Sequence, residues 1–441
     1  MDTCRRDAYS GAMSSITSSR NVRLGIDFGT TNTVVVLLDA DGQPQPTRFT
    51  FPHHPPDETC RTLLCLWQEE ARPGQPALHE AIGPAAIDAY LEDPAESRLI
   101  MSMKSYLAQA SFRQTRLLGR IMTLEMMIAR FLTCLMRTIQ VDPAHVTATV
   151  GRPVQFAGEI ADNDFGEQRL RDSFRAAGFQ HVNIALEPEA AGWRFAQRLT
   201  EPATVLVADF GGGTSDFSIL RFDPDAPHRA IPLGYAGVGI AGDQFDYRII
   251  DRVIAPELGR STTYRVMGGQ PLPVPAEWYA SLGHWHRLAL MRTPQTLRNI
   301  ADVARTAAEP EKLHALMNLI EDQQGQALYR AVGAAKRELS MADRTTLTYD
   351  HRDIHISRDI TRAEFESWIA PDLIRFDNAV ETALERASLP ATAIDRVFLT
   401  GGTSFVPAVR DLFIRRFGRE RVDMGGEFVS VAEGLALMNA A

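Results

Sequence analysis

The 441-residue sequence lacks several features that would assign it to common classes of protein. No stretch approaches the roughly 18 uncharged apolar residues that cross a membrane, and the first twenty residues have no apolar signal-peptide core. The net charge is -9 and the basic residues are scattered among acids, so we expect binding neither to nucleic acid nor to an anionic membrane. Four cysteines, Cys4, Cys60, Cys65 and Cys134, form no CxxC pair and no disulfide spacing, which indicates a reducing cytoplasm.

Motifs of three enzyme classes are absent or lack their context. No GxxxxGK[ST] sequence occurs, which excludes a P-loop protein, and no HExxH metal motif occurs. The pairs His284 with His286 and His351 with His355 are interpreted as surface residues rather than metal ligands. Residues 237–242 spell GxGxxG, but no apolar strand ending in an acid follows, so we do not expect a dinucleotide site of the NAD type.

Size and composition are those of a globular protein with more than one domain. A mass of 48.9 kDa predicts about two to three domains. Hydrophobic residues make up 45% and charged residues 23% of the chain, which argues against disorder.

The most informative feature is a strand–turn–strand unit that occurs twice, over residues 24–36 and 205–220. In each, an apolar strand ends in an aspartate, Asp27 or Asp209, and a turn rich in glycine and threonine follows. Glycine lets the backbone approach a phosphate closely, so that N–H groups and hydroxyls can bind it. Two such hairpins facing each other would hold a nucleotide triphosphate, and their recurrence suggests an internal duplication with a boundary near residues 201–202.

The remaining pattern predicts alternating strands and helices. A capping box, Thr361 with Glu364, marks the start of a long helix over 362–387. The other expected elements are an irregular region over 43–76, helix over 80–140, strand over 146–150, helix over 167–177, strand over 182–186, helix from Pro188, helix to 258, an irregular aromatic segment over 259–310, helix over 311–339, strands at 346–349, 353–356 and 396–399, and helices over 406–417 and 431–439.

Five segments, in order along the chain, resemble motifs of the nucleotide-binding domain of the seventy-kilodalton heat shock chaperones (DnaK type), within the actin and sugar-kinase superfamily. Residues 25–32 (GIDFGTTN) and 209–216 (DFGGGTSD) are similar to the two phosphate loops of that family. Residues 187–191 (EPEAA) resemble its connecting glutamate motif, 335–340 (AKRELS) its adenine-side helix and 401–407 (GGTSFVP) its adenosine loop. Any one alone is modest evidence, but five in family order make a specific signal.

The resemblance implies an α/β protein with an actin-like ATPase fold, in which two ribonuclease H-like lobes with small rim subdomains flank a nucleotide cleft. We expect a disordered tail over 1–21, lobe I over 22–203 and lobe II over 204–430, followed by a C-terminal helix over 431–441. The rim subdomains are expected at about 46–117 and about 241–355.

The resemblance also implies site roles. Asp27 and Asp209 are expected to hold the water shell of Mg²⁺, while Lys104, Glu187, Asp216 and Thr214 act at the γ-phosphate and the attacking water. The residues expected to bind ATP or ADP are Gly29, Thr30, Thr31, Asn32, Gly211, Gly212, Gly213, Thr214, Gly242, Lys336, Arg337, Ser340, Gly401, Gly402, Thr403 and Phe405.

Ordinary structural roles stay open for the same residues. Asp27 and Asp209 could simply form turns, and Lys104 could be a solvated surface lysine. Glu187 could stabilise a helix start, and Asp216 could pair with a neighbouring hydroxyl.

The sequence departs from the family pattern in places. Gly333 stands where the family has a glutamate, and Phe405 stands where an arginine stacks on adenine, although an aromatic ring can also stack on a purine. The segment 259–310 is longer than usual, and its Trp278 and Trp285 either pack an extra subdomain, which we favour, or form a surface for a protein partner.

We expect a slow ATPase, acting as a chaperone or an ATP-driven conformational switch without its own peptide-binding domain, because the sequence ends at Ala441. The alternatives are a small-molecule kinase of the sugar type, a nucleotide-binding scaffold that does not hydrolyse ATP, and an actin-like filament protein. The oligomeric state is left open.

Overall fold

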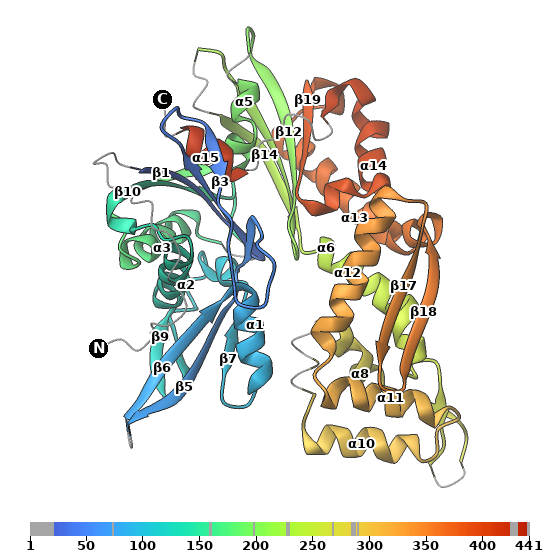
Figure 1. Ribbon diagram of the computed structural model, residues 1–441. Helices are drawn as coiled ribbons and strands as arrows, with labels where there is room; N and C mark the ends of the chain where they lie inside the picture. Colours follow the sequence, from blue (N-terminus) through green and yellow to red (C-terminus); the bar gives the residue numbers. More distant parts are fainter. Residues whose placement is uncertain are drawn as a thin grey trace.

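The structure is a computed structural model that describes residues 22–72, 75–157, 161–196, 199–225, 230–266, 269–283, 288, 291–423 and 431–438. The expected tail over 1–21, Cys4, Trp285, and the pair His284 with His286 lie outside these residues. Figure 1 shows two groups of elements, one coloured blue to dark green and one light green to orange, each built around a large sheet.

The first large sheet has six strands and contains the first hairpin. Its order is β11-β10-β1-β2-β3, with β4 also paired to β2. Strand β1 runs parallel to β10 and antiparallel to β2, and its apolar residues Leu24, Ile26 and Phe28 are buried. The bounds are β1 (Val22–Phe28), β2 (Asn32–Leu38), β3 (Pro44–Pro46), β4 (Thr59–Arg61), β10 (Val146–Arg152) and β11 (His181–Leu186).

The second large sheet repeats this topology around the second hairpin. Its order is β14-β13-β12-β19-β20, and β12 runs antiparallel to β13 and parallel to β19, as β1 does to β2 and β10. Nearly every residue of β12 is buried, which explains its continuous apolar run. The duplication suggested by the sequence is therefore present in the strand order. The bounds are β12 (Ala203–Phe210), β13 (Ser215–Phe222), β14 (Ile231–Val238), β19 (Arg396–Thr400) and β20 (Val422–Asp423).

Helices α2 and α3 pack against each other and contribute to the core beneath the first sheet. Each begins at a polar cap: the Thr123 side chain accepts from Met126 N–H, and the Asp162 side chain accepts from Phe165 N–H. A smaller sheet of order β6-β5-β7, with α1 packed on it, and the hairpin β8–β9 complete this group. The bounds are β5 (Leu64–Arg72), β6 (Gln75–Ile82), α1 (Gly83–Glu92), β7 (Arg98–Ile100), a 3₁₀ helix (Met103–Tyr106), β8 (Gln114–Leu117), β9 (Arg120–Thr123), α2 (Leu124–Thr138), a 3₁₀ helix (Pro143–His145), α3 (Asn163–Ala176), α4 (Glu187–Ala191) and α5 (Trp193–Ala196).

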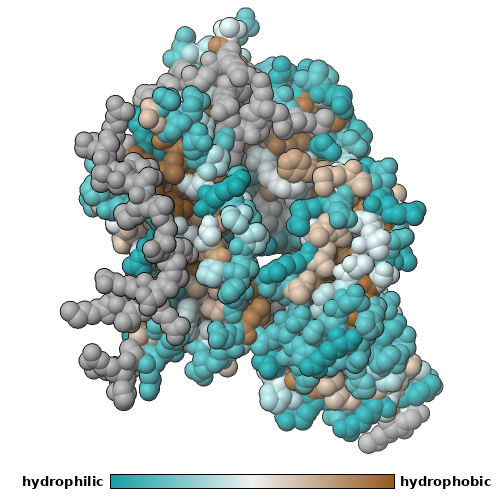
Figure 2. Space-filling model, in the orientation of Figure 1, coloured by the Kyte–Doolittle hydropathy of each residue, from teal (hydrophilic) through white to brown (hydrophobic). Residues whose placement is uncertain are grey.

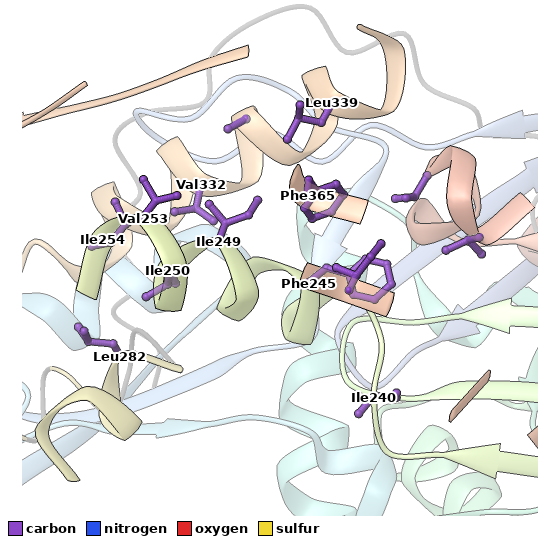
Figure 3. Close-up of a cluster of buried hydrophobic side chains, with 14 of the residues drawn as sticks. Ile240, Phe245, Ile249, Ile250, Val253, Ile254, Leu282, Val332, Leu339 and Phe365 are labelled. Atoms are coloured by element: carbon purple, nitrogen blue, oxygen red, sulfur yellow. The ribbon is translucent and has the colours of Figure 1, made fainter. Parts of the chain in front are cut away.

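The second group has a continuous apolar core beside the second sheet. Figure 3 shows Ile249 of α6 and Val253 of the π-helical turn after it facing Val332 of α12, with Phe245 and Phe365 nearby. The bounds are α6 (Gly242–Ile249), a π-helical turn (Ile250–Ile254), α7 (Ala255–Glu257), β15 (Thr263–Tyr264), β16 (Leu272–Pro273), α8 (Ala276–Ala280), a 3₁₀ helix (Ser281–Gly283), α10 (Pro294–Ala304), α11 (Pro310–Glu321), α12 (Gly325–Met341), β17 (Arg344–His351), β18 (Ile354–Thr361), α13 (Arg362–Ala387), α14 (Pro407–Phe417) and α15 (Val431–Met438), with further 3₁₀ turns at Ala391–Ala393, Gly402–Phe405 and Arg419–Arg421.

Helix α15 packs on β1, β2 and β10 of the first sheet and on α4. The approach to β1 is close, because a Cβ on Gly25 would lie 2.9 Å from the Cβ of Ala436. Glycine at this position therefore lets the last described helix support the strand that ends in Asp27.

Several element predictions were wrong. The region 43–76 is not irregular throughout, because it contains β3, β4 and β5, and the helix expected over 80–140 is divided into α1, β7, the β8–β9 hairpin and α2. The helix expected over 311–339 breaks near Gln323, whose positive φ of 55° is incompatible with a continuing helix. The capping box of Thr361 and Glu364 is confirmed at the start of α13.

Candidate functional site

The two hairpins carry the same turn at corresponding positions. After β1, the N–H of Gly29 donates to the carbonyl oxygen of Asn32 at 3.0 Å. After β12, the N–H of Gly211 donates to the carbonyl oxygen of Thr214 at 2.9 Å. Both turns therefore fold back in the same way, immediately after the strand that carries Asp27 or Asp209.

The tips of these turns touch each other. A Cβ on Gly212 would lie 2.9 Å from the Cβ of Thr31 and would collide with its hydroxyl group. Only glycine leaves room for this approach. The contact brings the tips of the two turns together, and residues of both turns line one cleft.

A cleft of about 1900 Å³ surrounds this contact, and Figure 2 shows the surface hollowed between the two groups of elements. Almost all residues that the sequence predicted to form a site line the cleft. They are Asp27, Gly29, Thr30, Thr31, Asn32, Lys104, Glu187, Asp209, Gly211, Gly212, Thr214, Asp216, Gly242, Lys336, Arg337, Gly401, Gly402, Thr403 and Phe405. Gly213 and Ser340 are not among the lining residues; the Ser340 hydroxyl donates to the carbonyl oxygen of Lys336 at 3.2 Å within α12.

Lys104 and Glu187 form an ion pair at the base of the cleft, and each residue is only 8% exposed. Lys104 comes from the 3₁₀ helix Met103–Tyr106, and Glu187 is the first residue of α4. Burial lowers the pKa of Lys104, but the charges of Glu187, Asp27 and Asp209 outweigh burial and raise it above its ordinary value. Lys104 is therefore a fixed positive charge among carboxylates.

Three aspartates around this pair have raised pKa values. Removal from water, together with the charge of Glu187, raises the pKa of Asp27 to about 7. Burial and the neighbouring carboxylates, Asp27 first, raise the pKa of Asp209 to about 7. Burial raises the pKa of Asp216 to about 6, although a hydrogen bond from Tyr235 opposes the shift. The cluster holds more negative charge than Lys104 compensates.

This excess charge predicts a pH dependence of stability. Because the folded-state pKa values of Asp27 and Asp209 lie above the ordinary 3.8, the folded protein binds more protons than the unfolded chain between about pH 4 and 7. The free energy of unfolding of the ligand-free protein should therefore fall as the pH rises through this window. We expect the double variant Asp27→Asn, Asp209→Asn to lose part of this dependence when thermal unfolding midpoints are compared at pH 5.5 and pH 8. Parallel profiles for variant and wild type would contradict the shifts.

A second part of the cleft lies beside α12. The Lys336 ammonium donates to the carbonyl oxygen of Gly242 at 3.0 Å and pairs with Asp246 Oδ1 at 2.9 Å. A Cβ on Gly242 would lie 3.2 Å from the Thr403 hydroxyl oxygen, so these residues converge. Phe405 lines the cleft with 62% of its surface exposed. Its aromatic face is therefore accessible for stacking.

Sequence reasoning missed three residues of this site. The Tyr235 hydroxyl donates to Asp216 Oδ1, the Thr400 hydroxyl donates to Asp209 Oδ1 at 3.3 Å, and Asp246 pairs with Lys336. Asp246 lies four residues after the glycine segment noted at 237–242, and Thr400 directly precedes Gly401, so both had a local signal. No sequence signal marked Tyr235, because its contact with Asp216 depends on the pairing of β14 with β13.

The donor set suits a hard cation such as Mg²⁺, because it consists of carboxylate and hydroxyl oxygens with uncompensated charge. Among the described residues, no group of three or more His, Cys, Asp or Glu side chains converges to cage an ion.

The segment 259–310 contributes to the core as far as it is described. Trp278, Tyr279 and Leu282 are buried in the core of the second group. It also contains helices α8 and α10, where the sequence predicted irregular structure. The burial of Trp278 supports the packing interpretation over a partner surface at this residue. Within the described part of the chain, no helix is long and apolar enough to cross a membrane.

The fold and the cleft define a mixed α/β protein with two sheets of equal topology and paired glycine- and threonine-rich turns. Sequence comparison finds known proteins that are similar to this chain. The family model described as Hsp70 protein matches residues 304–440. The chaperone proteins DnaK of two Halobacterium salinarum strains, R1 and NRC-1, are each 28% identical to the chain over 402 residues, which cover 88% of this chain and 50% of the relative.

The chain is therefore similar to the heat shock protein 70 chaperones, in agreement with the motifs. It spans about half the length of the curated relatives that it matches.

Proposed function

We propose that this protein binds ATP with Mg²⁺ in the cleft, hydrolyses it slowly and uses the cycle as a conformational switch. The observation that carries this proposal is the contact between Thr31 and Gly212, which brings two matched turns together above a buried Lys104–Glu187 pair. Backbone N–H groups of both turns could then bind one phosphate chain from two sides.

The proposed arrangement is an actin-like ATPase fold. The two sheets would form the cores of two ribonuclease H-like lobes, over 22–203 and 204–430, with rim subdomains at about 46–117 and about 241–355. Helix α15 would belong with lobe I, because it packs on the first sheet.

Different side chains of the cleft would have different roles in hydrolysis. Lys104 would donate hydrogen bonds to the γ-phosphate oxygens, where a fixed positive charge stabilises the transition state. Glu187 and Asp216 would orient the attacking water and accept its proton, while Thr214 and the turn N–H groups hold the phosphates. Mg²⁺, when bound near Asp27 and Asp209, neutralises charge on the phosphate oxygens.

The base would lie between α12 and the Gly401–Gly402 turn. Lys336 and Arg337 line this side, and the exposed ring of Phe405 could stack on adenine where the family has an arginine. A chaperone role and a cytoplasmic location are part of the same proposal. The DnaK relatives support the chaperone role, and the free thiols of Cys60 and Cys65 support the cytoplasmic location.

The test is the fate of the γ-phosphate in purified protein supplied with radiolabelled ATP, with Mg²⁺ or with EDTA. We expect magnesium-dependent release of inorganic phosphate, and no labelled sugar when sugars are added. Labelled phosphosugar would identify a kinase instead. Binding without hydrolysis would identify a scaffold, and ATP-dependent sedimentation would identify a filament protein.

A further inference from the structure

Tyr235 contacts Asp216 through its side chain, although the two residues lie on different strands. Tyr235 belongs to β14 and Asp216 to β13, and the tyrosine hydroxyl donates a hydrogen bond to Asp216 Oδ1. Both residues line the cleft and also a second, small cavity of about 10 Å³ behind it. The pair therefore forms part of the cleft wall next to Glu187.

Gly237 leaves the space in which this pair fits. It is the register partner of Asp216 across the two strands. A Cβ at this position would lie 2.5 Å from the Tyr235 hydroxyl oxygen and 2.9 Å from Asp216 Oδ1. Any side chain here would push the two groups apart, so the glycine and the tyrosine belong to one arrangement.

The backbone of β14 is held in place behind Tyr235. The Arg386 guanidinium donates to the carbonyl oxygen of Tyr235 at 2.7 Å, from the end of α13. A Cβ on the preceding Gly234 would lie 2.9 Å from the Cβ of Ala387, so the strand lies directly on that helix. The backbone that carries the Tyr235 side chain is therefore held against α13.

We propose that Tyr235 is a positioning residue for ATP hydrolysis, which holds the Asp216 carboxylate toward the Lys104–Glu187 pair so that it can orient the attacking water. With Oδ1 held by the tyrosine hydroxyl, the carboxylate cannot rotate freely, and Thr214 contributes a further hydrogen bond to it from the turn. This inference rests on the proposed function. It adds a residue that none of the recognised motifs contains.

The experiment compares Tyr235→Phe with wild type in single-turnover hydrolysis and in nucleotide titration. We expect the rate to fall about tenfold, because a hydrogen bond to a charged acceptor is lost, while the affinity for ADP and ATP changes less than about twofold. The matched control is Tyr349→Phe. The Tyr349 hydroxyl has no hydrogen-bond partner among the described residues and lies in β17, outside the cleft, so that variant should behave as wild type.

Two further readouts do not depend on the phenylalanine variant alone. Gly237→Ala should lower the single-turnover rate as well, since its methyl group separates the pair. Without nucleotide, the difference between wild-type and Tyr235→Phe tyrosine vibrational spectra should show a hydroxyl that donates to a carboxylate, and Asp216→Asn should shift that signal.

The outcomes separate this inference from the function on which it rests. A wild type that does not hydrolyse ATP overturns both. A wild type that hydrolyses ATP, with Tyr235→Phe equal to it, overturns the positioning role alone. A loss of affinity as large as the loss of rate, or a thermal midpoint lowered in parallel with activity, assigns Tyr235 a structural role and also overturns the proposal.

Discussion

Replacement of Lys104 by alanine is expected to slow single-turnover ATP hydrolysis by about 100-fold while nucleotide binding persists. The reason is positional: the ammonium group is buried beside Glu187, and the carboxylates of Glu187, Asp27 and Asp209 keep it charged. Such a preorganised charge contributes most where negative charge develops in the transition state. Rapid mixing with labelled ATP, followed by acid quench, measures the step.

The control for Lys104 is another of the few lysines in the chain. It has only three lysines, Lys104, Lys312 and Lys336, among 46 basic residues. Lys312 pairs with Glu309 at 2.9 Å and does not line the cleft, so Lys312→Ala should hydrolyse ATP at the wild-type rate. Alanine at position 104 leaves Glu187 buried without its partner, which could lower the stability of the protein. The experiment should therefore include a second variant, Lys104→Met, and the thermal unfolding midpoint of each variant should be measured. Equal hydrolysis rates in wild type and both Lys104 variants would remove this residue from the mechanism.

Asp209→Asn is expected to weaken magnesium-dependent ADP binding by at least about tenfold, or about 1.4 kcal/mol. Asp209 lies at the end of β12, accepts a hydrogen bond from Thr400 and has its pKa raised by burial and by the neighbouring carboxylates. A cation between Asp209 and Asp27 would relieve this repulsion, and the amide would remove half of the site's charge. Calorimetric titration with Mg²⁺ and with EDTA measures the effect.

The diagnostic result is the interaction between variant and metal. In EDTA, Asp209→Asn and wild type should bind ADP with similar affinity, because the carboxylate acts through the ion. Asp302→Asn, on the exposed surface of α10 where Asp302 pairs with Arg305, is the matched control. A tenfold loss that persists without the metal would instead indicate direct damage to the phosphate site.

Local sequence signals predicted the parts of the site that depend on short-range geometry. The turns after Asp27 and Asp209 close with hydrogen bonds between residues three apart, and glycine and threonine specify them within one segment. The Thr361–Glu364 capping box is local in the same sense. The recurrence of the hairpin suggested a duplication, and the two large sheets do repeat one strand order, but that order itself was not predicted.

The wrong predictions involve contacts between distant residues. The strands β8 and β9 have only four residues each, and β5 ends in the mostly polar stretch QEEAR, so their periodicity alone does not distinguish a strand from a helix. Strand β5 is stabilised by pairing with β6 and β7, which the sequence pattern does not reveal. The pairing of Lys104 with Glu187 spans 83 residues and was not predicted, because the family resemblance implied only that both residues act at the γ-phosphate and the attacking water. The Tyr235–Asp216 contact had no family motif and remained unseen.

The most direct measurement of the central claim is the position of a Mn²⁺ ion, substituted for Mg²⁺, in crystals grown with ADP. Anomalous diffraction locates the ion independently of any assumption about the nucleotide. We expect one peak between Asp27 and Asp209, beside the β-phosphate and within reach of both carboxylates directly or through one water. A nucleotide bound outside the space between the two turns, or an ion that approaches only one of these aspartates, would contradict it.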